Sequence, residues 1–544
     1  MNKFLIVSIF CIIFNIYPSF SQGNKLPHLE KNYGRLQLFV HQSPFLILGG
    51  ELGNSTASNA AYTKPYWPAF KSMNLNTVLL PVYWELLQPA ENKFDFSLID
   101  SLVFDARKNN IKLVLLWFGT WKNSMSCYTP EWVKTNSAKY QRTQDKQKRS
   151  QEILSAFSET NSDTDKKAFS TLMHHIKQID NADNTVIMVQ VENEIGMLPT
   201  AREISIIADN AFTKEIPEEL KNYLTKNSDQ LVPFLKNKWE TNGKKTSGTW
   251  NEVFGSGIET DEIFQAWYYA KYTNEVANAG KKEYNIPMYV NAALPRKGKK
   301  PGEYPSAGPL PHLLNIWQIA APSIDILSPD FYNPDIQYWC DLYTVNGNPL
   351  FIPEMQLDES CAAKNFYVFG HYKALGFSPF SIENAGGKIR SALGKSYAVI
   401  KLTDSMYLQK PYLNLDGVYL NKEDESKQIK MGNYIVNLDH ELRLPWHSST
   451  KDSAWPSSGA MIIQIAENEF VISGTGIVAT FENTDKGKVT NLLSVDEIYI
   501  NAGGKKIERR LNGDEDHQGR HVKILSGDWQ IQRVRLYNSS ANIE

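Results

Sequence analysis

Short apolar runs alternate with longer amphipathic segments from about residue 45 to residue 382. A continuous Val/Ile/Leu run is typical of a strand that is buried on both faces, and strand–helix alternation is typical of a parallel sheet. Eight such runs occur, at residues 44–50, 77–83, 111–118, 185–191, 288–291, 324–327, 350–352 and 377–382. Eight parallel strands separated by helices close a (β/α)8 TIM barrel, so the pattern predicts an α/β fold of this type.

The segments between these runs contain helical patterns and one polar insertion. Helices are expected at 97–109, at 218–239 with a break at Pro233, and at 261–277. Residues 138–167 are rich in Lys, Gln and Ser, which indicates an elaborated loop with a polar helix. The pair His174-His175 lies in a helical pattern where consecutive side chains point to different faces, so it does not indicate a metal site.

The pattern changes after about residue 401, where short alternating strands and Gly/Asn turns begin. Such strands predict an all-β, sandwich-like C-terminal domain, although they would also suit a small barrel. The domain boundaries expected from these changes are 1–21 for a signal peptide, 22–405 for the barrel and 406–544 for the β domain. Packing against the barrel is the favoured role for the β domain, and contact with carbohydrate is the alternative.

Composition and charge narrow the class of partner. The 544 residues are 42% hydrophobic and carry a formal net charge of −2, with Lys and Glu interspersed throughout. A nucleic-acid partner is therefore not expected, because nucleic-acid binders usually carry a clustered basic face. The local basic run at 296–300 is interpreted as a solvated loop.

The N-terminus has the pattern of a cleavable secretory signal. One Lys precedes an apolar stretch at 4–16, and small residues at 19–21 suit a signal peptidase. The stretch is shorter than the roughly 18–20 residues of a membrane span, so no integral membrane span is expected. The chain is therefore expected to be secreted or periplasmic, and lipidation at Cys11 is not favoured.

Removal of the signal leaves Cys127, Cys340 and Cys361. Three thiols cannot form a disulfide framework; Cys340 and Cys361 either pair or remain as buried free thiols. No Cys/His spacing of a metal site is present, and neither a metal nor a cofactor is expected.

Two glutamates lie at the ends of predicted barrel strands. Glu194 follows the fourth apolar run, and Glu354 follows the seventh. In a TIM barrel the chemistry gathers at the carboxyl ends of the strands, and strands four and seven lie across the lumen from each other. A pair of carboxyl groups, one protonated and one ionised, is what glycosidic bond cleavage requires. The pattern predicts that Glu194 and Glu354 face one substrate.

Glu192 competes with Glu194 for the same role. In a regular strand the two side chains would share a face, and a nearby like charge would raise a carboxyl pKa. The favoured interpretation of Glu192 is an ion-paired barrel residue.

Several sequence motifs around the two glutamates and the predicted strands resemble those of a known enzyme family. The segment VQVENEIG at 189–196 resembles the acid/base motif of glycoside hydrolase family 35, the β-galactosidases. The segment NLNTVLLPVYWELLQPAENKFDFSLID at 74–100 resembles the second strand and following loop of that family, and the similarity extends from about residue 38 to 384. The chain is most similar to a bacterial branch with a β-rich C-terminal domain. The resemblance implies a TIM barrel with the acid/base on strand four and the nucleophile on strand seven.

Carried over to this sequence, the resemblance assigns Glu194 as the acid/base and Glu354 as the nucleophile. Asn193 would bind the sugar 2-hydroxyl, and Tyr332 would hydrogen-bond to the nucleophile unless it is a core tyrosine. Weaker candidates for sugar contacts lie near the ends of strands one to three: Glu51, Asn54, Tyr83, Glu85, Trp117 and Trp121. The two tryptophans either stack on a pyranose ring or only pack at the rim of the barrel.

The chain also departs from the family pattern. A loop that carries a galactose-binding glutamate in the family reads LWFGTWKNSMS here, and the nucleophile stands between Pro353 and Met355. The expected activity is a retaining exo-β-glycosidase, in first place a β-galactosidase acting on terminal β-galactosyl residues of plant-type glycans. The alternatives are a clan relative for a different terminal sugar and a non-catalytic carbohydrate-binding protein.

Overall fold

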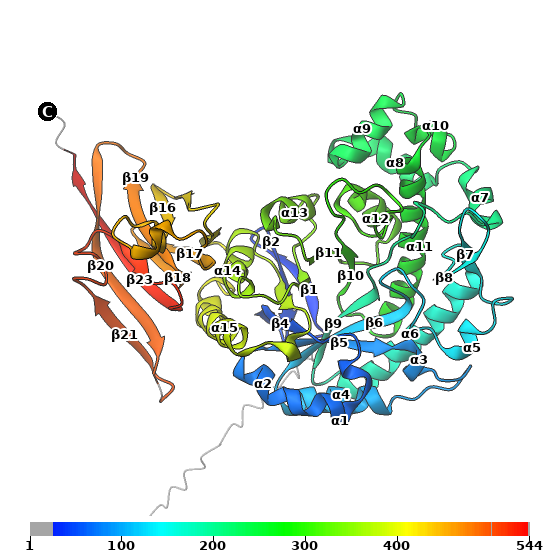
Figure 1. Ribbon diagram of the computed structural model, residues 1–544, viewed down its shortest axis with the longest axis horizontal. Helices are drawn as coiled ribbons and strands as arrows, with labels where there is room; N and C mark the ends of the chain where they lie inside the picture. The colour runs from blue at the N-terminus through cyan, green and yellow to red at the C-terminus, as the bar shows by residue number, and fades with distance from the viewer. Residues whose placement is uncertain (1–24, 502, 542–544) are drawn as a thin grey trace, which may run out of the picture.

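Eight parallel strands close into one barrel, at the centre and right of Figure 1. The computed structural model describes residues 25–501 and 503–541, so the predicted signal peptide lies outside the described residues. The TIM barrel predicted from the apolar runs is confirmed, and each run contributes one strand. In chain order these are β4 (Ile47–Glu51), β5 (Thr77–Tyr83), β6 (Lys112–Lys122), β9 (Val186–Asn193), β10 (Met288–Ala293), β11 (Ile326–Phe331), β12 (Ile352–Met355) and β13 (Gly376–Pro379).

Helices cover the outside of the barrel and extend it on one side. The expected break near Pro233 is present, but this proline begins a helix instead of ending one, because the first helical position needs no N–H. The main helices are α2 (Trp67–Ser72), α3 (Trp84–Leu87), α4 (Ser97–Lys108), α6 (Glu159–Asp180), α7 (Ile206–Phe212), α8 (Glu218–Lys226), α9 (Pro233–Thr241), α10 (Trp250–Phe254), α11 (Ile258–Glu283), α12 (Leu314–Ala320), α13 (Ile336–Tyr343), α14 (Cys361–His371) and α15 (Gly387–Tyr407).

The polar insertion at 138–167 ends in the polar first turns of α6, as predicted, but its loop is more ordered than expected. It contains a hairpin of β7 (Arg142–Gln144) and β8 (Ser150–Leu154), and α6 begins only at Glu159. Asp145 holds the turn, since its carboxylate accepts hydrogen bonds from the backbone N–H groups of Gln147 and Arg149. Such a side-chain-stabilised turn leaves no hydrophobic pattern in the sequence.

A small antiparallel sheet precedes the barrel and was not predicted. It consists of β1 (His28–Asn32), β2 (Arg35–Val40) and β3 (Ser43–Phe45), so the first apolar run begins in β3 and enters the barrel only at Ile47. The sheet is tied to the end of α15, where Arg35 donates to the carbonyl of Leu413 and Gln37 to that of Leu408.

The C-terminal region is all-β, as predicted. Two separate antiparallel sheets enclose one apolar core, which favours the sandwich over the small barrel. One sheet has the order β14 (Asn414–Leu420), β17 (Ser458–Ala466), β18 (Glu469–Thr475), β23 (Gln530–Ser540), β20 (Lys488–Ile500), β21 (Lys506–Leu511), and the other β15 (Ser426–Met431), β16 (Tyr434–His440), β19 (Ile477–Asn483), β22 (Val522–Ile524).

The larger sheet is apolar on both faces. Along β17, Ile462 points into the sandwich core, whereas Met461 and Ile463 belong to the core that continues into the barrel. Side chains alternate between the two faces of a strand, so a strand of this composition must be covered on both sides. Helices α14 and α15 lie between this sheet and the barrel strands in Figure 1. The β domain therefore packs on the barrel through an apolar interface.

The three cysteines outside the predicted signal segment are free thiols. Cys340 and Cys361 are both buried and unpaired, and Cys127 is exposed. Among the described residues, no helix combines the length and hydrophobicity of a membrane-spanning segment.

The contact between α14 and the β domain depends on glycine, which gives a first prediction. A Cβ added at Gly370 would lie 2.6 Å from the carbonyl oxygen of Asp416, which is backbone and cannot move aside easily. Gly370→Ala should therefore destabilise the protein by about 1–3 kcal/mol, as overpacked sites do. Thermal unfolding should show a lower midpoint. Gly387→Ala is the control, because a Cβ there meets no atom within 4 Å; equal midpoints for the two variants would contradict the interface.

Candidate active site

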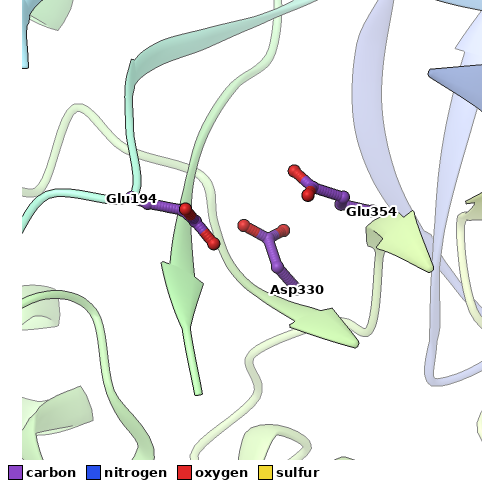
Figure 2. A group of neighbouring side chains, drawn as sticks. All are labelled: Glu194, Asp330 and Glu354. Atoms are coloured by element: carbon purple, nitrogen blue, oxygen red, sulfur yellow. The ribbon is translucent and has the colours of Figure 1, made fainter. Parts of the chain in front are cut away.

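The barrel brings three carboxyl groups together at the carboxyl ends of its strands. Glu194 directly follows β9, Asp330 lies in β11 and Glu354 in β12, where it pairs in register with Asp330. One carboxylate oxygen of each residue lies within 4.8 Å of those of the other two. Figure 2 shows the three side chains converging from separate strands. Glu194 and Glu354 are only 6% and 5% exposed, so their charges are largely removed from water.

The backbone around Glu194 turns the two neighbouring glutamates apart. Glu192 and Glu194 have φ angles of 62° and 43°, in the left-handed region that non-glycine residues rarely adopt. The alternation of a regular strand is therefore lost, and the expectation that both side chains share a face is wrong. The backbone N–H of Glu194 donates to Asn291 Oδ1 at 3.0 Å, which helps to hold this conformation.

Glu192 lies away from the cluster and is not the ion-paired residue that was expected. It is fully buried, accepts a hydrogen bond from the backbone N–H of Trp121 at 2.6 Å and lies against Asp165 on α6. Burial and the Asp165 charge raise the pKa of Glu192 well above its usual value. No ion pair to Glu192 forms within the described ranges, so the prediction fails because its neighbour is another acid.

Two side-chain amides orient the acidic cluster. The Asn123 amide donates to the Glu194 carboxylate, and Asn291 Nδ2 donates to Asp330 Oδ2 at 2.6 Å. Because Asn291 also accepts from the backbone of Glu194, one side chain links β9 to β11. These contacts fix the direction in which Glu194 points.

Glu354 has an environment that balances opposing influences on its charge. Burial, and next the charge of Glu194, raise the pKa of Glu354 to about 7, whereas Lys122 and a hydrogen bond from Tyr332 lower it. The Tyr332 hydroxyl donates to one carboxylate oxygen, which is the contact that the family resemblance implies. The second oxygen, Oε2, is buried and has no hydrogen-bond partner among the described residues. Glu51 lies beside this carboxyl group, and in its neutral form it can donate a hydrogen bond to Glu354, which also lowers the pKa of Glu354.

Glu51 and Asp330 add two further carboxyl groups that favour the neutral form. Burial raises the pKa of both well above the usual range, and the Glu354 charge raises it further. A protonated carboxyl group can donate a hydrogen bond, whereas an ionised one can only accept. In their neutral forms, Glu51 and Asp330 can therefore donate hydrogen bonds from their carboxyl hydroxyl groups.

Asn193 is prepared to bind a polar group. It is fully buried, and neither its amide nitrogen nor its oxygen has a partner in the described part of the chain. Asn54 similarly has a buried Oδ1 without a partner. Buried polar atoms are normally satisfied, so the unpartnered amide of Asn193, next in sequence to Glu194, indicates a place for a ligand. Asn54 contacts Tyr83 through its backbone carbonyl, and no contact joins it to the carboxyl cluster within the described residues.

Four of the predicted sugar contacts have other roles. The prediction that Trp117 and Trp121 stack on a sugar is wrong, because both are fully buried: Trp117 donates to Asp165 at 2.9 Å, and Trp121 donates to the carbonyl of Leu154. Their alternative interpretation as packing residues is the one that the structure supports. The structure also does not bring Tyr83 and Glu85 to the cluster. The Tyr83 hydroxyl donates to the Asn54 carbonyl at 2.7 Å, and Glu85 pairs with Lys134 at 3.4 Å.

Lys122, Asp330, Asn123 and Asn291 were missed from the sequence. Asn291 ends the predicted fifth run, so the strand-end rule that identified the two glutamates would have found it. Asp330 lies beyond the predicted sixth run, which ended at Leu327, because β11 continues to Phe331. Lys122 ends β6, which runs four residues beyond the predicted end at Phe118, so it had been assigned to a loop.

The spacing of Glu194, Asp330 and Glu354 also meets the geometric requirement for holding a cation. Carboxylate oxygens are the preferred ligands of Ca²⁺ and Mg²⁺. Here, however, Asp330 favours its neutral form, and each of the three groups already accepts a hydrogen bond from Asn291, Tyr332 or Asn123. The donor set therefore suits proton transfer better than metal coordination.

Comparison with known families supports a glycosidase. A family model described as β-galactosidase, glycoside hydrolase family 42, matches residues 62–256. The barrel thus carries a glycoside hydrolase domain. The matching family is 42, whereas the motifs indicated family 35, and the two belong to the same clan. A second model, described as a domain of unknown function (DUF5597), matches residues 393–523, and no curated protein matches the sequence.

Solved structures resemble about two thirds of the chain. The β-galactosidase from Bacillus circulans sp. alkalophilus superposes with a TM-score of 0.45 at 15% identity, over 66% of this chain and 56% of that one. The β-galactosidase from Marinomonas ef1 gives 0.44 at 11% over 66% and 60%, and that from Halorubrum lacusprofundi gives 0.45 at 12% over 64% and 57%. The chain thus spans little more than half the length of these proteins, and similarity at this level says nothing about its substrate.

The charge balance at Glu354 gives a second prediction. A reaction that needs ionised Glu354 should lose kcat/KM as the pH falls through about 7, the pKa of that carboxyl group. In Lys122→Met the cation that lowers this pKa is gone, so the acidic limb of the pH profile should move to higher pH, by about one unit. Lys122→Arg should restore the limb, and the exposed Lys300→Met is the control. An acidic limb that stays in place in Lys122→Met would contradict the electrostatic role of Lys122.

Proposed function

We propose that the protein is a retaining exo-β-glycosidase, in first place a β-galactosidase that removes terminal β-galactosyl residues. The observation that carries this proposal is the separation of the Glu194 and Glu354 carboxyl groups, whose nearest oxygens lie within 4.8 Å. Retaining enzymes hold the two groups about 5–5.5 Å apart, whereas inverting enzymes leave about 6.5–9.5 Å for a water molecule. The short separation supports a covalent intermediate.

In the proposed mechanism the two glutamates act in two displacements. Glu354 Oε2 attacks the anomeric carbon while Glu194 protonates the departing oxygen. Glu194 then removes a proton from water, which attacks the same carbon and releases the sugar with its configuration retained. Tyr332 stabilises the ionised nucleophile through its hydrogen bond and can turn this donor toward the ring oxygen once the charge of Glu354 has been consumed.

Asn193 and the neutral carboxyl groups would bind the sugar. The unpartnered Asn193 amide lies next in sequence to the acid/base and suits the 2-hydroxyl, a contact that strengthens as the transition state forms. Glu51, at the end of β4, has two buried oxygens without partners and suits another ring hydroxyl.

The galactoside preference draws support from the β-galactosidase model matched at 62–256 and from the motifs shared with family 35. Lys122 favours a second candidate, a retaining β-glycosidase for a different terminal sugar. This residue places a buried cation in the segment LWFGTWKNSMS, which replaces the family's loop with its galactose-binding glutamate. A non-catalytic carbohydrate-binding barrel is disfavoured, because both glutamates are present with orienting hydrogen bonds.

Secretion and action on plant-type oligo- or polysaccharides complete the proposal. The signal-like segment at 1–21 supports export to the periplasm or the exterior, where glycans too large for uptake would be met. A panel of nitrophenyl β- and α-glycosides, tested with the wild type and Glu354→Gln, examines the proposed activity. Cleavage of the β-galactoside that is lost in the variant is expected; cleavage of another β-glycoside would select the second candidate, and no cleavage at all would overturn both.

Replacement of the nucleophile gives the third prediction. Glu354→Ala should lower kcat on an activated aryl β-glycoside on the order of a thousandfold or more, because no covalent intermediate can form. Azide should restore turnover and give the α-glycosyl azide, since the small anion fits the space vacated by the carboxylate. The control is Glu359→Ala, an exposed glutamate nearby. A loss smaller than tenfold in Glu354→Ala would remove the nucleophile assignment.

The acid/base role of Glu194 gives the fourth prediction. In Glu194→Ala, substrates with poor leaving groups should slow far more than a dinitrophenyl glycoside, because only poor leaving groups need protonation. The measurement is a plot of log kcat/KM against leaving-group pKa, which should become steeper in the variant. Parallel plots for the two proteins would show that Glu194 does not donate the proton.

A further inference from the structure

A cavity lies at the carboxyl ends of β10 and β11, the two barrel strands between those that position Glu194 and Glu354. It has a volume of about 670 Å³ and is formed by the loop after β10, the loop after β11 and the adjoining faces of α9, α11 and α13. Figure 1 shows α9, α12 and α13 along the same border of the barrel. This volume falls in the range of about 300–1,000 Å³ that is typical of ligand sites. We call this cavity the basic groove.

Two connections place the basic groove next to the reaction centre. Asn333, which lines it, follows Tyr332, the residue that donates to Glu354. The loop after β10 is tied to the segment after Glu194, because Met197 and Ser306 form a backbone bridge with an N–O distance of 2.7 Å. The groove therefore lies at the same end of the barrel as the carboxyl cluster.

Aromatic side chains provide apolar surface in the groove. Tyr338 is 54% exposed and packs edge-on against Trp339, and Phe234 lies across from them on α9. Large aromatic side chains on a polar surface combine an apolar face with a polar tip and are enriched at binding sites. The C–H faces of pyranose rings suit such surfaces.

Three cations in the groove have no acidic partner. Arg296, Lys297 and Lys299 line it and are exposed, and no ion pair or side-chain hydrogen bond to them is present within residues 25–501 and 503–541. The sequence had indicated a solvated loop for this run. Their exposure agrees with that prediction, and all three residues also line the cavity.

The carboxylates that line the groove are already engaged. Glu259 pairs with Lys238 at 3.0 Å, and the buried Glu262 accepts from His312 at 2.9 Å. Asp335 caps the first turn of α13, where its side chain accepts a backbone N–H at 3.1 Å. The charged groups of the groove that have no partner among the described residues are therefore the cations.

From these observations we infer that the basic groove binds the leaving-group portion of an anionic glycan whose acidic groups are the carboxylates of hexuronic acid residues. This inference rests on the proposed glycosidase function and adds its substrate class. The terminal neutral sugar occupies the carboxyl cluster, and the uronic acid chain lies over Tyr338 and Trp339 with its carboxylates facing Arg296, Lys297 and Lys299. Arginine and lysine pair with carboxylates through charge-assisted hydrogen bonds.

The test compares two tetrasaccharides that differ only in charge. Each carries one terminal residue of the sugar that the aryl-glycoside panel selects, followed by three hexuronic acid residues or by their carboxyl-reduced, neutral counterparts. The wild type should cleave the acidic form with at least a tenfold higher kcat/KM, and this advantage should shrink as salt screens the charges. The triple variant Arg296→Ala/Lys297→Ala/Lys299→Ala should lose the advantage and keep its activity on the neutral form and on the aryl glycoside within about twofold.

A matched control and an aromatic variant complete the design. Lys300→Ala removes a charge from the same loop outside the groove and should leave the preference unchanged. Trp339→Ala should weaken both tetrasaccharides and spare the aryl glycoside, which does not reach the groove. The aryl glycoside reports the proposed function by itself, so its loss in the wild type would be a failure of that function and not of the groove.

Three results would overturn the inference. The wild type could show no preference for the acidic tetrasaccharide, or the triple variant could keep the wild-type preference. The wild type could also prefer an O-sulfated tetrasaccharide over the neutral one while it shows no preference for the uronic acid form. That result would assign the groove to sulfate groups. Retention of the preference in Lys300→Ala together with its loss in the triple variant would establish the groove as a site for uronic acid residues.

Discussion

The burial of several carboxyl groups in one small volume is the constraint on which the rest of the site depends. Glu51, Glu194, Asp330 and Glu354 cannot all be ionised where water is largely excluded, because like charges at this range repel strongly in a medium of low polarity. The barrel resolves this conflict by leaving Glu51 and Asp330 neutral. It places a cation and a hydroxyl donor at Glu354, the group whose ionised form can attack carbon. The different environments of these groups thus give them different tendencies to hold a proton, although all of them are carboxyl groups.

The fold follows from the same demand for positioning. Strand ends converge at the mouth of a barrel, so residues more than a hundred positions apart in sequence meet without a long loop to carry them. Left-handed backbone at Glu192 and Glu194 then separates two side chains that a regular strand would place together. The β domain covers one side of the barrel through α14, where Gly370 allows the backbone of β14 to approach closely.

The sequence predicted the barrel and the two central glutamates because long apolar runs and their ends are direct signals of buried parallel strands. It did not predict which way each side chain of a doubly buried strand points. Trp117 was expected to contact a sugar, but its indole donates to Asp165 instead. Glu192 was expected to pair with a basic residue, but its neighbour is the acidic Asp165. Short, half-exposed pairs such as β7–β8 and β1–β2 depend on turn contacts that leave no periodic pattern. The proximity of Lys122 to Glu354 arises only in the folded barrel and therefore could not be predicted from the sequence.

The measurement that tests the account most directly is the configuration of the sugar when it is first released. Proton NMR can follow hydrolysis of the aryl β-glycoside that the enzyme cleaves fastest, at time points before mutarotation mixes the anomers. The arrangement of Glu194 and Glu354 predicts that the β-anomer appears first, because two displacements restore the original configuration. Initial release of the α-anomer would contradict the account, since it would require water to attack directly between carboxyl groups that lie too close together to admit it.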